Sequence, residues 1–310
     1  MTDSTTPPRA EPTHRSVRVL INPRSGVLRS LVSVQEAIDR FWDEPTTDLV
    51  YQTTHSPEDG RNKALRAVEM GIDTMIVVGG DGTINSIGNC LIGSHTALTT
   101  IPMGSGNGFA RHFGVPLRVF DAAEALSKGY RTRIDVGKVN GHSFFITCSL
   151  AWDAAIAQGF QQFPVRGILP YVFAGAYTLL DYRPQPIDAE IDGVWHHFEK
   201  PLVFTVANLT QYGGGAVIAP NAKPDDGLLE LVVVENDNIA RLVANLPHLW
   251  QGTLDDVEQV KKWRFKTLKV RRRRPDPIQI DGELLKAGAD LEITVAPRCL
   301  DIIAPGEPEL

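Results

Sequence analysis

The chain has 310 residues, of which 43% are hydrophobic and 22% charged, as in globular proteins, and this length favours two domains. The formal net charge of −6 argues against nucleic acid as the main partner, and contact with an anionic surface would need a local basic patch. The three cysteines, Cys90, Cys148 and Cys299, form no metal or disulfide spacing, which fits a reducing cytoplasm.

The first half of the chain alternates short apolar runs with helical patterns. Residues 1–15 are polar and contain prolines, so we expect a disordered tail and no signal peptide. No apolar run approaches the ~20 residues of a membrane-spanning helix. The predicted strands are Ser16–Ile21, Leu49–Thr53, Met75–Val78 and Ala97–Pro102, and the predicted helices are Leu31–Trp42, Pro57–Met70, Thr83–Ile92 and Val119–Lys128. This alternation predicts a Rossmann-like three-layer α/β domain over residues 16–132.

Strand patterns dominate the second half, after about Tyr130. We expect an antiparallel, β-sandwich-like domain over residues 133–295, opening with a hairpin on the turn Asn140-Gly141. The predicted strands are Arg133–Val139, His142–Leu150, Pro186–Ile191, Trp195–Phe198, Leu202–Asn208, Leu228–Val234, Leu268–Arg273 and Ile278–Ile280.

Two glycine-dense loops follow consecutive buried strands. Gly79–Thr83 follows the first of them and Gly104–Gly108 the second. Glycines let the backbone approach an anion closely, and a following helix N-terminus adds a favourable dipole. We therefore expect two polyanion sites side by side, with Asp81 placed to orient or hold a cation. The second loop is not a GxGxxG motif, because Phe109 stands at its third glycine, and the chain has no GxxxxGK[ST] phosphate loop.

Three further turns are candidates for chemistry, each with a plain structural alternative. Residues 22–26 (NPRSG) close the first strand and could form another anion site or a simple turn. The acidic turn Asp225-Asp226-Gly227 offers the oxygen ligands that hard cations prefer, or is an ordinary hairpin turn. The sequence Asp281-Gly282-Glu283 places carboxylates after a strand, where one could accept a proton from a hydroxyl, or it is a common hairpin turn.

GGDGTIN followed by IPMGSGNGFAR resembles the catalytic domain of the diacylglycerol kinase and sphingosine kinase superfamily, and is most similar to its soluble bacterial lipid kinases. The motifs NPRSG, GGDGT with GSGN, GGG with PDDGL, and DGE occur in the order of that family. The resemblance implies a fold of the NAD-kinase and lipid-kinase type, with residues 296–305 returning to the first domain. It also implies a cytoplasmic enzyme that uses ATP and Mg²⁺ on a lipid at the membrane surface, with peripheral membrane association. A homodimer is left open.

The resemblance also implies roles for individual residues. Glu283 would accept the proton of the lipid hydroxyl, Asp281 would lie close to the water and metal network, and Asp81 would face the phosphates and the catalytic Mg²⁺. A structural Mg²⁺ would bind at Lys223, Asp226 and Leu228, partly through backbone oxygens. The implied nucleotide contacts are Asn22, Pro23, Ser25, Gly26, Thr54, Gly79, Gly80, Asp81, Gly82, Thr83, Asn85, Gly104, Ser105, Gly106 and Asn107.

The chain departs from the family pattern at two positions. Ser86 stands where the family usually has glutamate, and Ala151 replaces a glycine before Asp153. Diacylglycerol is the first choice of substrate, with a sphingoid base or another lipid alcohol second. An NAD kinase shares GGDGT but not the second glycine motif, and a non-catalytic nucleotide-binding module is the remaining alternative.

Two other segments have both a structural and a lipid-related interpretation. The apolar stretch Phe163–Tyr182 is a core helix or a wall of an acyl-chain pocket. The run Arg271–Arg274 is a solvated strand or a contact for anionic head groups.

Overall fold

The structure is a computed structural model of the chain, and it describes residues 15–23, 31–42, 45, 47–152, 182–235 and 244–306. Several expectations from the sequence fall outside these ranges. They are those on residues 1–14, Ser25, Gly26, Asp153 and 163–181.

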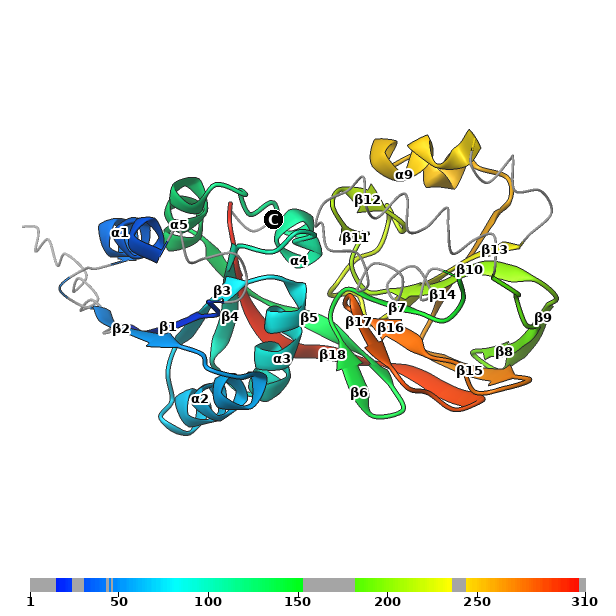
Figure 1. The fold of residues 1–310 in the computed structure, drawn as a ribbon, viewed down its shortest axis with the longest axis horizontal. Coiled ribbons are helices and arrows are strands. Elements are labelled where there is room, and N and C mark those ends of the chain that lie inside the picture. Colours follow the sequence, from blue (N-terminus) through cyan, green and yellow to red (C-terminus); the bar gives the residue numbers. More distant parts are fainter. Residues whose placement is uncertain are drawn as a thin grey trace, which may run out of the picture.

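The first half of the chain forms a parallel sheet with helices on both faces. Its strands lie in the order β2-β1-β3-β4 and pair in parallel. Their bounds are β1 (Arg15–Ile21), β2 (Thr47–Thr53), β3 (Thr74–Gly79) and β4 (Ala97–Pro102). The helices are α1 (Leu31–Trp42), α2 (Pro57–Glu69), α3 (Asp81–Leu91), α4 (Gly108–His112) and α5 (Val119–Ser127). Figure 1 shows α1 and α5 on one face and α2 and α3 on the other.

Local sequence explains where these elements begin and why the sheet is central. The Ser56 hydroxyl accepts the N–H of Asp59 at 3.1 Å and caps α2, whose first residue is Pro57. Every residue of β3 and β4 is buried, as expected for strands covered on both faces. The glycine-dense loops therefore start at the carboxyl ends of two adjacent central strands.

The second half forms a sandwich of two antiparallel sheets. One sheet has six strands in the order β14-β13-β10-β7-β16-β17, and the other continues the first-domain sheet through β18, β15, β8 and β9. The bounds are β5 (Tyr130–Val139), β6 (His142–Phe144), β7 (Thr147–Ser149), β8 (Ile187–Ile191), β9 (Val194–Phe198), β10 (Pro201–Ala207), β11 (Gln211–Gly213), β12 (Ala216–Val217), β13 (Leu229–Glu235), β14 (Val260–Phe265), β15 (Thr267–Arg272), β16 (Ile278–Ile280), β17 (Glu283–Leu285) and β18 (Asp290–Ala304), with helix α9 (Pro247–Gln251) and the short helix η2 (Leu254–Asp256). Apolar side chains of both sheets form one core between them. The expected α/β domain followed by a β-sandwich-like domain is confirmed.

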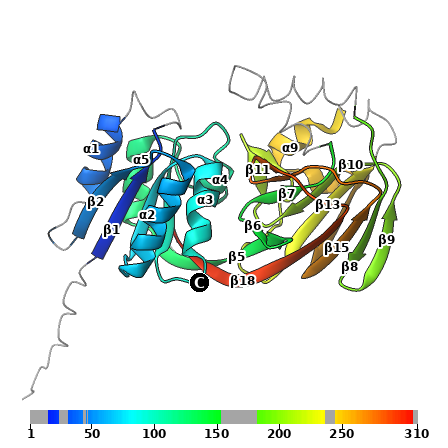
Figure 2. The ribbon, with the colours of Figure 1, turned by 60° about the horizontal axis from the view of Figure 1, so that its bottom comes forward.

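Strand β18 belongs to both halves of the molecule (Figure 2). Its first part pairs with β15, and its last part lies parallel to β4, with Ile302 opposite Leu98. It also pairs with β5 along most of its length, with a bulge between Ala296 and Leu300. Because β18 pairs with strands of both halves, its backbone hydrogen bonds fix the position of the sandwich relative to the parallel sheet.

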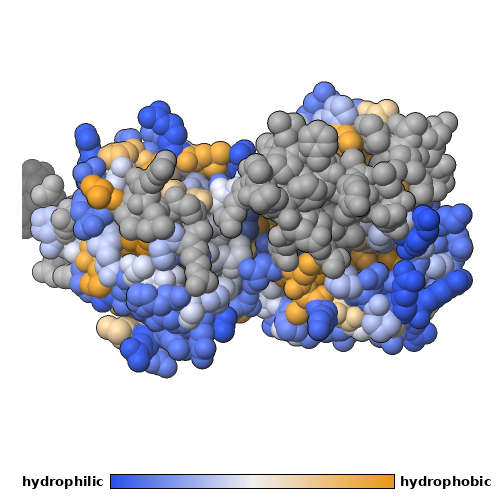
Figure 3. Space-filling model, in the orientation of Figure 1, coloured by the Kyte–Doolittle hydropathy of each residue, from blue (hydrophilic) through white to orange (hydrophobic). Residues whose placement is uncertain are grey.

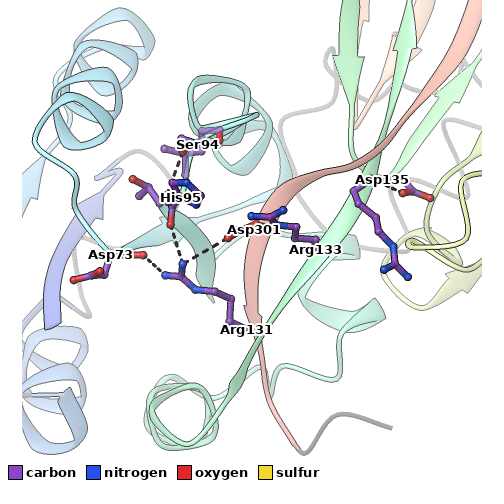
Figure 4. A network of polar contacts seen from close by, with 10 residues as sticks. Asp73, Ser94, His95, Arg131, Arg133, Asp135 and Asp301 are labelled. Carbon is purple, nitrogen blue, oxygen red and sulfur yellow. Dashed lines mark hydrogen bonds and ion pairs between the residues drawn. The ribbon is translucent and has the colours of Figure 1, made fainter. Parts of the chain in front are cut away.

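A buried carboxylate on β18 supports this crossing (Figure 4). Asp301 accepts a hydrogen bond from Nε of Arg133 at 2.6 Å and lies 3.5 Å from Nη1 of Arg131. The Arg131 guanidinium also donates to the backbone carbonyls of His95 and Asp73, at 2.9 and 2.7 Å. This network ties β5 and β18 to the loops that precede β3 and β4.

Two strand predictions were wrong in detail. The expected strand His142–Leu150 is two strands, because the chain leaves the β5 sheet after Phe144 and joins the other sheet at Thr147. The N–H groups of the crossing residues bond to the Asp281 carboxylate instead of a neighbouring strand. Strand β14 was not predicted, and its sequence VKKWRF has only one buried residue, Phe265, so no alternating pattern indicates a buried face.

Within the described ranges, the structure contains no helix that is both long and apolar enough to cross a bilayer. Figure 3 shows mostly hydrophilic side chains on the described part of one face, with smaller and separated hydrophobic areas.

Strand pairing at Gly137 gives a stability prediction. Gly137 on β5 lies opposite Phe144 on β6, and a Cβ added at Gly137 would lie only 2.1–2.5 Å from three atoms of the Phe144 ring. We expect Gly137→Ala to lower the free energy of unfolding by about 1–3 kcal/mol, because a buried ring must move. Urea unfolding measures it, with Gly288→Ala as control, since a Cβ there has no neighbour closer than 3.9 Å. Equal stabilities of the two variants would contradict the prediction.

Candidate active site

The two glycine-dense loops touch each other through their backbones. A Cβ added at Gly80 would lie 3.0 Å from Cα of Gly104, and a Cβ added at Gly104 would lie 2.7 Å from Cα of Gly80. Any larger residue at either position would push the loops apart. The predicted pairing of the loops is therefore a direct contact that requires glycine on both sides.

Asp81 joins the first loop to the helix that follows the second. It is the first residue of α3, and its carboxylate oxygens accept the N–H groups of Gly108 and Phe109 at 2.9 and 3.1 Å. Burial raises the pKa of Asp81, and these backbone hydrogen bonds oppose the rise. The hydrogen bonds of Asp81 thus go to the end of the second loop and the start of α4. Its expected contact with phosphates and Mg²⁺ stays a prediction.

Asn107 closes the second loop. It has a left-handed backbone conformation with φ of 52°, and it precedes α4. Its side chain accepts the N–H of Gly104 at 2.9 Å and donates to the carbonyl of the same residue at 2.8 Å. Asn107 therefore shapes the loop through its own backbone, whereas Ser105 at the loop tip is exposed.

The end of β1 lies beside the first loop. The Asn22 side chain donates to the Thr83 hydroxyl at 2.8 Å, which places Asn22 and Pro23 next to Gly79–Thr83. Thr54 ends β2 and is buried, with its N–H donating to the Ile21 carbonyl at 2.8 Å. One edge of the sheet thus brings together Asn22, Pro23 and Thr83. Thr54 is buried at the same edge and contacts the end of β1.

A third glycine run from the second domain completes the cluster. The N–H of Gly214 donates to the Gly106 carbonyl at 2.8 Å, and a Cβ added at Gly213 would lie 3.1 Å from Cα of Gly106. A Cβ at Gly108 would lie 3.0 Å from the Tyr212 carbonyl oxygen. Three glycine runs that are distant in sequence therefore meet with almost no side chain between them.

Glu283 brings a carboxylate of the second domain to the first glycine loop. A Cβ added at Gly82 would lie 2.6 Å from Oε1 of Glu283 and 3.4 Å from its Cδ. Glu283 is the first residue of β17 and is exposed. An exposed carboxylate beside the N-terminus of α3 can take a proton from a bound hydroxyl.

Asp281, two residues earlier, has very different surroundings. It is buried, and its carboxylate accepts four hydrogen bonds, from Phe145 N–H (2.8 Å), Ile146 N–H (2.8 Å), Thr147 N–H (3.0 Å) and Asn85 Nδ2 (2.7 Å). Burial raises the pKa of Asp281 to about 6, although these donors oppose the shift. Asn85 also donates to the Ser143 carbonyl at 3.1 Å. In this arrangement the Asn85 amide faces Asp281 and not the glycine loops, so nothing here supports its predicted nucleotide contact.

The acidic turn Asp225-Asp226-Gly227 was expected to hold a structural Mg²⁺ with Lys223 and Leu228. Asp226 Oδ1 accepts the Leu228 N–H at 3.0 Å, and Oδ2 pairs with Arg264. No group of three or more His, Cys, Asp or Glu in the described part of the chain could hold a metal ion. The turn offers the Asp226 carboxylate together with backbone oxygens, which is the kind of ligand set expected, so the structural Mg²⁺ stays a prediction.

The run Arg271–Arg274 does not present four parallel charges. The Arg271 guanidinium lies 5.0 Å from the centre of the Trp195 ring, and Arg271 is opposite Asp188 and Asp290 on the neighbouring strands. Arg272 points inward and donates to the carbonyls of Asp276 and Gly288 at 2.8 and 2.6 Å. Only the last two arginines remain exposed and outside the strand.

The sequence interpretation missed Asp135, which supports the acidic turn. This fully buried residue of β5 accepts the N–H of Gly227 at 2.6 Å and that of Arg298 at 2.7 Å. Burial raises the pKa of Asp135, against the backbone hydrogen bonds and with a further rise from Asp226 and Asp225. The sequence feature that could have indicated a buried carboxylate is the position of Asp135 between the apolar residues Ile134 and Val136 of β5.

His112, at the end of α4, was also missed. Its Nδ1 accepts the N–H of Thr210 at 3.2 Å and lies 2.9 Å from the Thr210 hydroxyl. Burial lowers the pKa of His112 to about 4. A neutral imidazole therefore links the helix after the second loop to the strand that leads into the third glycine run.

This histidine predicts a pH dependence of stability. The unfolded chain binds a proton at His112 near pH 6.5 and the folded chain only near pH 4, so unfolding takes up a proton in between. Stability should therefore fall as the pH drops from 6.5 to 4, by at most about 3 kcal/mol from this group. In His112→Asn, whose Oδ1 can replace Nδ1 as acceptor, this part of the loss should vanish from chemical denaturation curves. The exposed His95→Asn is the control, and equal pH profiles of wild type and His112→Asn would contradict the assignment.

Comparisons with known proteins agree with this geometry. The family described as "Diacylglycerol kinase catalytic domain" matches residues 16–139, and the one described as "YegS C-terminal NAD kinase beta sandwich-like domain" matches residues 147–304. A diacylglycerol kinase of Mycobacterium tuberculosis is 28% identical, over 93% of this chain and 95% of its own length. "Probable lipid kinase YegS-like" of Chromohalobacter salexigens is 30% identical, over 84% of this chain and 85% of its own length.

A solved structure supports the same fold. The crystal structure of a diacylglycerol kinase from Bacillus anthracis matches with a TM-score of 0.71 and 20% identity, over 96% of this chain and 99% of that one. The two family matches follow each other along the chain and together include the three glycine runs and Glu283. The chain belongs to the diacylglycerol kinase catalytic-domain family and is a lipid kinase.

Proposed function

We propose that this lipid kinase transfers the γ-phosphate of ATP, bound as its Mg²⁺ complex, to a lipid hydroxyl, with diacylglycerol as the first candidate substrate. One observation carries the proposal: the exposed Glu283 carboxylate lies against Gly82, at the start of the helix that follows the first glycine loop. The supporting relatives are named diacylglycerol kinase in Mycobacterium tuberculosis and in Bacillus subtilis.

In the proposed reaction, the glycine runs place the phosphates and Glu283 handles the proton. The backbone around Gly80 and Gly104 can approach phosphate oxygens because no side chain stands in the way. The lipid hydroxyl binds within hydrogen-bond reach of Glu283, which orients it and takes its proton as the oxygen attacks the γ-phosphorus. The bond between the γ-phosphorus and the bridging oxygen breaks, and ADP leaves with the charge of that oxygen.

Magnesium is proposed as part of the bound nucleotide. It supplies charge neutralisation on the phosphates when bound. Asp81 is the carboxylate nearest to both glycine loops, and its oxygens keep lone pairs beside the two amide hydrogen bonds. A structural Mg²⁺ at the turn of Lys223, Asp226 and Leu228 stays a prediction.

The substrate class and the place of action also belong to the proposal. A lipid alcohol must reach Glu283 from a membrane surface, so we propose peripheral membrane association of a cytoplasmic enzyme. Arg273 and Arg274 are exposed and lie beyond the end of β15, whereas the exposed Arg271 lies over the Trp195 ring, so the last two are the candidates for anionic head groups. A sphingoid base is the second candidate substrate.

The proposed proton acceptor can be tested directly. We expect Glu283→Gln to lower kcat by about 10²–10⁴-fold, the usual loss when a general base is removed, with little change in the Kd for ATP. The measurement is transfer of labelled γ-phosphate to vesicles that contain diacylglycerol or a sphingoid base, with NAD as a soluble acceptor. Glu292→Gln, an exposed glutamate on β18, is the matched control.

Each outcome of this assay has a clear meaning. Labelled diacylglycerol that disappears in Glu283→Gln and when Mg²⁺ is chelated supports the full proposal. Labelled sphingoid base would change the substrate but keep the mechanism. Normal kcat in Glu283→Gln would overturn the role of Glu283, and labelled NAD alone would overturn the lipid acceptor.

A further inference from the structure

The turn before Glu283 is a two-residue hairpin turn in which the aspartate side chain accepts hydrogen bonds from distant segments. Asp281 has φ of 47° and Gly282 has φ of 91°, so both lie in the left-handed region between β16 and β17. An aspartate adopts this conformation at a cost, which hydrogen bonds of its side chain can offset. The four donors to the Asp281 carboxylate are such contacts.

These donors come from two different parts of the molecule. Three are the backbone N–H groups of residues 145–147, where the chain passes from one sheet to the other. The fourth is the Asn85 side chain on α3, which is itself oriented by Asn89, whose Nδ2 donates to Asn85 Oδ1 at 3.0 Å. The hydrogen bond between Asn85 and Asp281 therefore connects the helix of the first glycine loop to the turn that carries Glu283.

Helix geometry makes this connection relevant to the active site. Asn85 follows Gly82 by three residues, so the two lie on the same side of α3 in successive turns. Glu283 rests on Gly82, and Asp281 bonds to Asn85. The β16–β17 turn thus contacts α3 at two points, one through each of its acidic residues.

We propose that Asn85 and Asp281 are positioning residues, whose hydrogen bond holds the β16–β17 turn against α3 so that the Glu283 carboxylate stays beside Gly82. This inference rests on the proposed function of Glu283. Asp281 acts through Glu283 and not as a proton acceptor, because its two oxygens already take four hydrogen bonds and are closed to solvent. Asn85 acts in the same way and does not contact the nucleotide.

Kinetics of single and double variants form the first test. Asn85→Ala should lower kcat by about 10–100-fold, as small displacements of catalytic groups do, and change the KM for ATP by less than about threefold. The control is Ser86→Ala, the adjacent position, whose buried hydroxyl has no hydrogen-bond partner among the residues that the structure describes. A raised KM for ATP with unchanged kcat would instead make Asn85 a nucleotide contact and overturn the proposal.

An exchange of the two side chains tests the hydrogen bond itself. Asn85→Asp alone places two carboxylates together, and Asp281→Asn alone places an NH₂ group against either Asn85 and the Phe145 N–H or the N–H groups of Ile146 and Thr147. The double variant restores one donor and one acceptor between residues 85 and 281, while the Phe145 N–H loses its acceptor. If the two substitutions acted independently, the fold-loss in kcat of the double variant would equal the product of the two single fold-losses. We expect kcat of the double variant to be at least about tenfold higher than that value, and a kcat equal to it would show that the pair is not coupled.

A cross-link reports the position of residue 283 without any catalysis. In a chain whose three cysteines are replaced, Gly82→Cys and Glu283→Cys place two thiols close together, because a Cβ at Gly82 lies 3.6 Å from Cγ of Glu283. Mild oxidation should form this disulfide quickly, and adding Asn85→Ala should slow it at least about tenfold, whereas Ser86→Ala should not.

The two kinds of measurement separate the two proposals. An unchanged cross-linking rate in the Asn85→Ala background would overturn the positioning role, whatever the kinetics show. If the wild-type chain labels no lipid, the proposed function fails, and slower cross-linking would still support the link between α3 and the turn. Circular dichroism of each variant identifies those that remain folded, and the conclusions come from these.

Discussion

Close backbone contact between the glycine runs is the constraint on which the rest of the site depends. Gly80 and Gly104 approach each other so closely that a single added methyl group would separate the loops. Gly213 makes the same kind of contact with Gly106 from the second domain. Close backbone packing leaves room for a ligand to approach the loops, although the N–H groups of Gly104 and Gly108 already donate to the side chains of Asn107 and Asp81.

Three aspartates connect distant segments in and around the site. Asp81 bonds to the first N–H groups of α4, Asp281 to the crossing at residues 145–147, and Asp135 to Gly227 and Arg298. Each takes backbone N–H groups from a segment distant in sequence, and burial raises the pKa of all three against the effect of these donors. Burial disfavours the charged carboxylate, and the backbone hydrogen bonds stabilise it. Glu283 differs because it is exposed, which suits a group that exchanges protons.

The continuous strand β18 explains how two domains can share one site. It pairs with β15 in the sandwich and with β4 in the first sheet, so neither half moves independently of the strand. The hydrogen bond from Arg133 to Asp301 also joins β5 to β18 where the strand passes between the two halves. Of this strand, the family resemblance implied only residues 296–305, since the long strand includes a bulge and polar residues that break the alternating pattern.

Several parts of the fold were predictable because their signals are local. The helix α2 begins at Ser56-Pro57 as its capping pattern indicates, and the turn Asn140-Gly141 has positive φ at both residues, as a two-residue hairpin requires. The glycine loops could be placed from sequence because each follows a short strand pattern, and both strands, β3 and β4, are buried throughout. By contrast, the break after Phe144 depends on Asp281, which lies more than a hundred residues away, and no local pattern could indicate it.

The sequence by itself determined the two-domain class, the family and the identity of the residues that could carry phosphoryl transfer, because motifs and periodicity are properties of short segments. Only the tertiary structure decided how those residues divide their roles. Glu283 and Asp281 are separated by one glycine, yet one lies exposed beside Gly82 and the other is buried among four donors. Asn85 belongs to the GGDGTIN motif but faces Asp281. The physical reason is that burial and hydrogen-bond partners come from contacts between distant segments, which side-chain type and spacing do not specify.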